Sequence, residues 1–262
     1  MGGRLHRGSD RPGVPTPGLA PGRRSVNPQA VVLDIEGTVG SARHVQDVLF
    51  PYARERLPQW FAEHRGTERA ERLLAEVRHD LRAGDLNEAG VVAALLAWTD
   101  EDIKAPALKE IQGWIWAAGY AEGSLTGHVY AEVPHVLRRW AESGASLYTY
   151  SSGSVAAQVN WFAHTTYGDL TPLLRGYFDL TTAGSKMYAA SYRRISEVIQ
   201  VPADATLFLS DSAEELDAAT EAGWRTVGVR RQDDPRRCPM PRHLTVRSLD
   251  EQELAQLMKG TE

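Results

Sequence analysis

The sequence predicts an α/β protein whose core is a doubly wound, Rossmann-like parallel sheet with a helical segment inserted after the first strand. Three observations lead to this class. The apolar run "AVVL" before Asp34 predicts a buried strand. Residues 41–130 show a helical pattern that no strand signal interrupts. From about residue 132, predicted strands and helices alternate, as they do in parallel sheets with helices on both faces.

The inserted stretch contains four segments of helical pattern. They read "VQDVLFPYARERLPQWFAEH", "ERAERLLAEVRHDL", "GVVAALLAWT" and "ALKEIQGWIWAAGYAEG". In the second segment the recurring apolar positions are Leu73, Leu74, Val77 and Leu81, with charged residues between them. This spacing predicts a helix with one buried face and one exposed face.

The alternating part begins with a helix in "VPHVLRRWAESG" and a strand in "ASLYTY". A helix after "SSGS" comes next, then a loop that extends to Lys186 and a helix in "YAASYRRISEVI". A strand, a helix and a strand follow in "ATLFLS", "AEELDAATEAG" and "RTVGVR". Ligands of such sheets bind at the carboxyl ends of the strands, so the residues that follow each strand are the candidates for a site.

These patterns divide the chain into three parts. Residues 1–28 are crowded with Gly and Pro and carry five arginines against one acid, so we expect a disordered tail there. Residues 29–40 and 131–262 form the predicted α/β catalytic core. Residues 41–130 form the predicted helical cap.

The composition excludes several kinds of partner and site. A net charge of -5 argues against nucleic-acid binding, which needs a concentrated excess of Lys and Arg. The chain has no uninterrupted apolar run of about 18 residues, so we expect no membrane span. Its single cysteine, Cys238, excludes an internal disulfide and suits a reducing cytoplasm.

Polar residues with complementary chemistry follow three of the predicted strands. They are Asp34, Glu36 and Thr38 after the first strand, Ser151, Ser152 and Gly153 after the second, and Asp211 after the third, with Lys186 before a helix between the last two groups. Each of them alone has a structural explanation, because an aspartate often caps a helix, Ser-Ser-Gly often forms a turn and a lone lysine is usually solvated. Together they indicate a site for a phosphate monoester.

The chemistry of each group supports this interpretation. Asp34 and Asp211 supply the hard oxygen ligands that Mg²⁺ prefers. The hydroxyls and backbone N–H groups of 151–153 can bind an anion at a helix start. Lys186 adds a positive charge for the remaining phosphoryl oxygens.

Asp34 is then the expected nucleophile, because its oxygen can form an aspartyl-phosphate and divide one difficult displacement into two easier ones. We expect Glu36 to protonate the leaving oxygen and later to accept a proton from the attacking water. Thr38 is expected to hold the loop through a bond from its side chain to the backbone.

This arrangement resembles the haloacid dehalogenase-like phosphohydrolases, whose usual first motif is Asp-x-Asp-x-Thr/Val. Within them, the chain is similar to the enolase-phosphatases of methionine salvage, also called acireductone synthases, over about residues 29–258. The segments that carry the resemblance are "DIEGT", "HVQDVLFPYARERLPQW", "IQGWIWAAGYAEGSLTGHVYAEVP", "YTYSSGSVAAQ", "GDLTPLLRGYFD", "KMYAASYRRI" and "FLSDSAEELDAATEAGW".

The resemblance implies a cytoplasmic, monomeric enzyme with one Mg²⁺ per subunit. Such an enzyme converts 2,3-diketo-5-methylthiopentyl-1-phosphate to the acireductone 1,2-dihydroxy-3-keto-5-methylthiopentene and phosphate. The substrate is a small phosphorylated diketone, which the enzyme enolises before it removes the phosphate.

The resemblance also implies a role for each site residue. Asp34 is the nucleophile and a metal ligand, and Glu36 gives an acid/base carboxylate and a backbone carbonyl to the metal. Asp211 completes the protein ligands of the metal. The remaining roles are phosphate binding by Ser151, Ser152 and Lys186, and retention of a metal-bound water by Glu215.

Three alternatives stay open from the residues themselves. The same fold and reaction could serve another small phosphate monoester, because the cap decides specificity. A phosphometabolite-binding protein without activity is the second alternative. The third is a dehalogenase, which also uses an aspartate nucleophile but attacks carbon and needs no metal.

Overall fold

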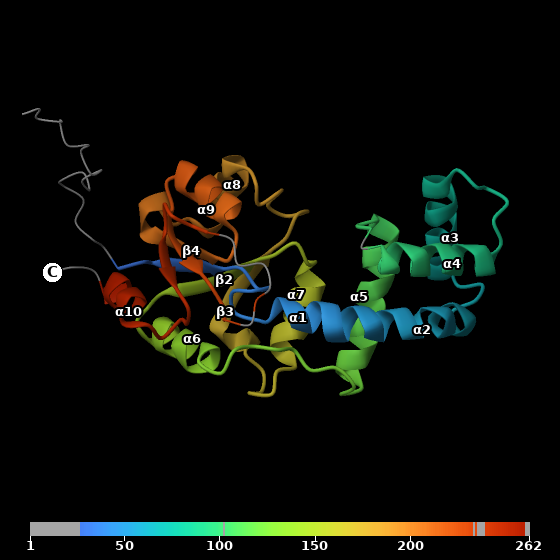
Figure 1. Cartoon of the computed structure of the whole chain (residues 1–262), viewed down its shortest axis with the longest axis horizontal. Coiled ribbons are helices and arrows are strands. Elements are labelled where there is room, and N and C mark those ends of the chain that lie inside the picture. The colour runs from blue at the N-terminus through green and yellow to red at the C-terminus, as the bar shows by residue number, and fades with distance from the viewer. Residues whose placement is uncertain (1–26, 102, 233, 235–238, 260–262) are drawn as a thin grey trace, which may run out of the picture.

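The computed structural model describes residues 27–101, 103–232, 234 and 239–259 of the chain (Figure 1). Two expectations fall outside these ranges: the disordered tail, of which only residues 27 and 28 are described, and the surroundings of Cys238. Among the helices of the described ranges, none combines the length and the apolar character that a membrane span requires.

The core is a parallel sheet, as the sequence predicts, but in the described residues it has six strands where the sequence pattern predicts four, the additional ones being Leu174–Phe178 and Leu244–Val246. The strands lie in the order β3-β2-β1-β4-β5-β6 across the sheet. Their bounds are β1 Ala30–Leu33, β2 Ser146–Tyr150, β3 Leu174–Phe178, β4 Thr206–Ser210, β5 Arg225–Val229 and β6 Leu244–Val246. The first strand of the chain therefore lies in the interior of the sheet.

Strand β1 is buried on both faces, which explains its uninterrupted apolar run. Val31 and Leu33 belong to the core on one face of the sheet, and Val32 belongs to the core on the other. Val31 lies opposite Leu147 of β2 and Leu207 of β4. The end of β1, where Asp34 follows, is thus flanked by the ends of two other strands.

Helices cover both faces of the sheet, so the fold is doubly wound (Figure 1). On one face the core includes residues of α6 (Val133–Glu142), α7 (Val155–Ala163) and α10 (Gln252–Lys259). Helices α8 (Ala189–Ile199) and α9 (Ala213–Glu221) contribute to the core on the other.

The stretch between β1 and α6 is helical and encloses an apolar core of its own. Its elements are α1 Ala42–His44, the π-helical turn η1 Val45–Leu49, α2 Phe50–Glu63, α3 Glu68–Leu81, α4 Glu88–Asp100 and α5 Pro106–Ala121. Leu73 and Val77 of α3 are fully buried in this core, as their spacing predicts. In Figure 1, α2 runs away from the sheet, and α3 and α4 lie near the end of α2 that is far from the sheet.

Strand β3 is an element that the sequence pattern does not predict. The sequence places a loop between α7 and Lys186, and the structure shows that this expectation is wrong for Leu174–Phe178. Exposed Arg175 and the glycine at 176 weaken the strand signal. Pairing with β2, with a register shift between Leu147 and Tyr148, defines this edge strand.

Candidate active site

The predicted site residues gather where the carboxyl ends of β1, β2 and β4 meet. A cavity of about 290 Å³ opens there. The predicted residues that line it are Asp34, Glu36, Ser151, Ser152, Lys186, Asp211 and Glu215. Thr38 and Gly153 are not part of the lining, but each is hydrogen-bonded to a residue that is.

Asp34 is buried, and its two carboxylate oxygens have different partners. Oδ1 accepts a bond from Lys186 Nζ at 2.5 Å, and Oδ2 accepts one from the hydroxyl of Thr38 at 3.1 Å. The Thr38 bond goes to a side chain, whereas the sequence suggested a backbone partner. Two directional bonds fix the plane of the carboxylate, which a nucleophile needs to approach phosphorus in line.

A tight turn after the strand places Thr38 for this bond. Gly37 has a φ of +82°, a conformation that favours glycine. The amides of Val39 and Gly40 both donate to the carbonyl of Ile35, at 3.1 and 2.8 Å. The sequence after β1 therefore folds back on itself within a few residues and brings Thr38 back to Asp34.

Lys186 lies between two carboxylates in the buried part of the cavity. Its Nζ is 2.5 Å from Asp34 Oδ1 and 2.6 Å from Glu215 Oε2, and the residue is 5% exposed. Burial alone would lower the pKa of Lys186, but the two carboxylates outweigh burial and raise the pKa above its usual 10.5. The ammonium group is therefore charged at neutral pH.

Glu215 comes from the first turn of α9, one turn beyond Asp211. Its Oε2 also accepts a bond from the Ser210 hydroxyl at 2.7 Å. Burial raises the pKa of the Glu215 carboxyl and the nearby charge of Asp34 adds to the rise, while Lys186 opposes it. Its tie to Lys186 is a contact that sequence reasoning missed.

The segment after β2 forms the capped start of α7. Ser154 caps the helix, since its hydroxyl accepts a bond from the amide of Ala157 at 3.2 Å. The amide of Gly153 donates to the hydroxyl of Ser151 at 3.1 Å, which holds the loop in a compact turn. Ser151 and Ser152 face the cavity from this helix start, where backbone N–H groups favour a negative charge.

Gln158 supports residues 151–154 (the serine loop) by hydrogen bonds, and sequence reasoning missed it. This buried side chain donates from Nε2 to the carbonyls of Gly153 and Phe178, at 2.9 and 2.8 Å. Its Oε1 accepts from the hydroxyl of Thr149 at 2.6 Å. The sequence signal was a polar residue near the start of a mostly apolar helix.

Asp179 is a second support that sequence reasoning missed. It follows β3, and one of its oxygens accepts from the amide of Val155 at the start of α7 at 3.0 Å. Its other oxygen accepts from the amides of Thr181 and Thr182, at 3.0 and 2.8 Å, and from the Thr182 hydroxyl at 2.9 Å. Asp179 thus ties the serine loop to the loop that carries Lys186.

Asp179→Asn should lower the free energy of unfolding at pH 7 by about 1–3 kcal/mol, because an amide cannot accept on both of its terminal atoms. Burial raises the pKa of Asp179, but the bonds from Thr182, Val155 and Thr181 outweigh burial and lower the pKa below its usual 3.8. The stabilisation is therefore present above pH 3.8 and is lost as the pH falls through the folded-state pKa.

Urea unfolding at several pH values tests this expectation. The difference between Asp179→Asn and the parent should shrink as the pH is lowered below 3.8. The exposed Asp204 provides a matched control, since Asp204→Asn should leave stability unchanged. Equal stability of Asp179→Asn and the parent at pH 7 would contradict the expectation.

The cavity holds donors for a divalent cation. Asp34, Glu36 and Asp211 all line it. Within the described ranges, no group of three or more His, Cys, Asp or Glu side chains forms a cage for a metal ion. Mg²⁺ does not require one, because it takes one or two carboxylates and fills its other positions with water and substrate oxygens. The residues present fit Mg²⁺ on the chemistry of this donor set.

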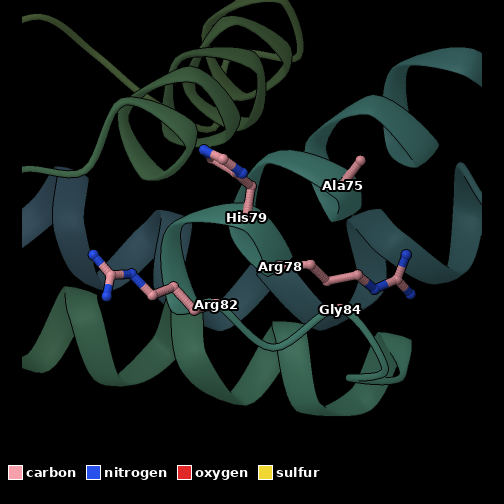
Figure 2. Close-up of a pocket in the computed structure, with 5 residues that line it drawn as sticks. All are labelled: Ala75, Arg78, His79, Arg82 and Gly84. Atoms are coloured by element: carbon pink, nitrogen blue, oxygen red, sulfur yellow. The ribbon is translucent and has the colours of Figure 1, made fainter.

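A larger hollow, of about 710 Å³, lies elsewhere, near the C-terminal end of α3 (Figure 2). Its lining residues are Ala75, Arg78, His79, Arg82 and Gly84. Figure 2 shows the side chains of Arg78 and Arg82 pointing away from each other. This hollow is open to solvent and contains none of the predicted site residues, so the smaller cavity is the candidate active site.

The sequence is similar to a known protein family and to several of its members. The family model described as haloacid dehalogenase-like hydrolase matches residues 28–223. The protein called Enolase-phosphatase E1 of Nocardia farcinica is 46% identical over 226 residues, which cover 86% of this chain and 97% of that protein. The protein of the same name from Cronobacter sakazakii is 49% identical over 199 residues, which cover 76% and 86%.

Solved structures agree with these matches. The UTR4 protein of Saccharomyces cerevisiae has a TM-score of 0.72 and 31% identity, covering 86% of this chain and 99% of that one. CbbY of Rhodobacter sphaeroides, at a TM-score of 0.52 and 16% identity, covers 85% and 95% and shares the fold. The chain belongs to the enolase-phosphatase family of the haloacid dehalogenase-like hydrolases.

Proposed function

We propose that this protein is a Mg²⁺-dependent bifunctional enolase-phosphatase of methionine salvage. It converts 2,3-diketo-5-methylthiopentyl-1-phosphate to 1,2-dihydroxy-3-keto-5-methylthiopentene and phosphate. The observation that carries this proposal is the shared cavity in which the fixed carboxylate of Asp34 meets Lys186 and the serine pair. The identity to proteins named enolase-phosphatase supports the choice of substrate.

Phosphoryl transfer uses Asp34 as the nucleophile. One of its oxygens forms a bond to phosphorus, and the bond from phosphorus to the enol oxygen breaks. Glu36 donates a proton to that leaving oxygen and later takes one from water, which then hydrolyses the aspartyl-phosphate. Phosphate departs, and the free carboxylate of Asp34 returns.

Lys186 and the serine loop hold the phosphoryl group for this reaction. The buried ammonium lies next to the nucleophile, so it can offset the charge of both the carboxylate and the phosphoryl oxygens. Ser151 and Ser152 bind the other oxygens from the helix start. These groups form no covalent bonds to the substrate, because positioning and charge stabilisation account for most catalysis of phosphoryl transfer.

Asp34, Asp211 and the backbone carbonyl of Glu36 would hold one Mg²⁺. When bound, the ion neutralises charge on the phosphoryl oxygens. Glu215 would hold a water of the ion, in addition to its contact with Lys186.

We also propose the division of the chain into a core of residues 29–40 and 131–262 and a cap of residues 41–130. The separate apolar core of α2–α5 supports this division. A cap of this kind excludes water while the diketone is enolised and the phosphate is transferred. We further propose that the enzyme works in the cytoplasm as a monomer.

An anaerobic assay with the diketone phosphate tests the function. With Mg²⁺ present, the enediol absorbance and free phosphate should both appear, and a chelator should abolish phosphate release. Phosphate release without the enediol chromophore would remove the enolase half of the proposal. Activity that survives chelation would instead favour metal-free chemistry, and a much larger kcat/KM for another phosphate monoester would change the substrate.

A further inference from the structure

We propose that Arg231 is a positioning residue. It fixes the loop after β1, residues 34–40 (the nucleophile loop), relative to residues 130–132, where the chain returns from the helical insertion to the core. This role rests on the proposed function, because it concerns the orientation of Asp34 during phosphoryl transfer. Arg231 follows β5 and does not line the active-site cavity. Its effect on the reaction must therefore pass through other residues.

The guanidinium group of Arg231 is hydrogen-bonded to the backbone of the nucleophile loop. Its side chain is 4% exposed. Nε and Nη2 both donate to the carbonyl oxygen of Thr38, at 2.8 and 2.6 Å. Two donors on one carbonyl hold that peptide in both distance and direction, which the rigid fork of an arginine does well.

The same guanidinium also contacts the segment that returns from the helical insertion. Nη1 is 2.5 Å from Glu132 Oε1, a carboxylate at the start of α6. The plane of the group lies over the ring of Tyr130, with Cζ 3.9 Å from the ring centroid. The amide of Tyr130 in turn donates to the carbonyl of Val39 at 3.0 Å. The guanidinium of Arg231 therefore contacts both the outgoing and the returning segment, which are also joined by this backbone bond.

A third segment closes the network. Nη1 also donates to the carbonyl of Arg247 at 3.2 Å, and Oε1 of Glu132 accepts from the amide of Leu249 at 3.4 Å. These contacts satisfy a charge that would be costly to bury alone. They also leave the guanidinium little freedom, so the Thr38 carbonyl is tied to distant parts of the chain in addition to its local turn.

The link to the nucleophile runs through Thr38. Arg231 holds the carbonyl of this residue, and the hydroxyl of the same residue donates to Asp34 Oδ2. A shift of the Thr38 backbone would move its hydroxyl and release one oxygen of the nucleophile. A misplacement of about 1 Å at a reacting group can cost about 100-fold in rate.

Arg231→Lys tests the proposal, because it retains the charge opposite Glu132 but cannot reproduce the two-donor fork on Thr38. We expect kcat for phosphate release to fall about 10–100-fold, with KM changed by less than about 3-fold. Arg230 is the matched control, since it is the neighbouring arginine and is exposed. Arg230→Lys should keep the parent kcat.

A double-mutant cycle separates positioning from a general structural effect. Thr38→Val removes the hydroxyl that Asp34 accepts from and should itself lower kcat. If Arg231 acts through Thr38, adding Arg231→Lys to Thr38→Val should change kcat by less than about 3-fold. Independent, multiplicative losses would overturn the proposal. An unchanged kcat in Arg231→Lys would overturn it as well.

Two further measurements complete the test. Thermal unfolding by circular dichroism is followed for each variant, and loss of the folded state in Arg231→Lys alone would assign Arg231 a structural role and overturn the proposal. Rates are measured with both the diketone phosphate and p-nitrophenyl phosphate. A parent that is active only on p-nitrophenyl phosphate contradicts the proposed function, whereas the ratios between variants on that ester still test Arg231.

Discussion

Asp34→Asn abolishes phosphate release, with an expected loss in kcat of about 10⁴-fold or more. The amide has nearly the shape of the carboxylate and can still accept a bond from Thr38, so the loop geometry should persist. The amide cannot also accept from Lys186, which keeps Glu215 as its partner, so the melting temperature should fall. It is a poor nucleophile, however, and forms no aspartyl-phosphate. Single-turnover phosphate release, together with a thermal melt, measures both parts of this expectation.

The control for this substitution is Asp204→Asn at an exposed position, which should match the parent. The inactive Asp34→Asn beside an active parent would also exclude a protein that only binds phosphometabolites. A variant that keeps more than a hundredth of the parent rate would show that another group attacks phosphorus.

Lys186→Met is expected to lower kcat for phosphate release by about 10²–10³-fold, because a buried charge beside the transferring group is lost. It should also destabilise the protein. The substitution leaves the carboxylates of Asp34 and Glu215 buried without the cation between them. Removing one member of a buried ion pair typically costs about 3–5 kcal/mol of unfolding free energy.

The two effects are measured by steady-state kinetics and by urea unfolding. Because the pKa of Lys186 is raised above 10.5, the contribution of its charge is present below that pH and is lost only as the pH rises through the folded-state pKa. In the parent, the charge of Lys186 should therefore be constant from about pH 6 to 9. Lys109→Met, at an exposed position, is the control. Parent-like stability in Lys186→Met would show that the two carboxylates do not need the lysine.

The sequence predicted the elements whose signals are local. The strand before Asp34 has an uninterrupted apolar run because both of its faces are buried, and the apolar spacing of α3 reports its single buried face. Asp34, Ser151 and Asp211 each follow a strand with such a signal. Since parallel strands align their carboxyl ends, predicting those strands was enough to bring the three residues together.

The parts that could not be predicted depend on partners that are distant in the sequence. Strand β3 exists because β2 pairs with it, and its own pattern is weak. Asp179 also follows a strand, as Asp34 does, but that strand has a weak pattern, and the oxygens of Asp179 accept from backbone amides of two segments. Arg231 lies in a segment with several arginines, and its contacts to distant residues such as Thr38 and Glu132 set it apart.

The interior position of β1 also has a consequence for how the protein folds. Both of its hydrogen-bonding neighbours, β2 and β4, lie beyond the whole helical insertion in the chain. The strand that precedes the nucleophile therefore leaves the ribosome well before either neighbour exists to pair with it. Long-range pairing of this kind is slow, because the entropy cost of closing the intervening loop comes before the strand contacts can stabilise it. The insertion can collapse around its own core first, so we expect the edge of the sheet that carries Asp34 to be among the last parts to form, and the apolar β1 to be open to aggregation until then.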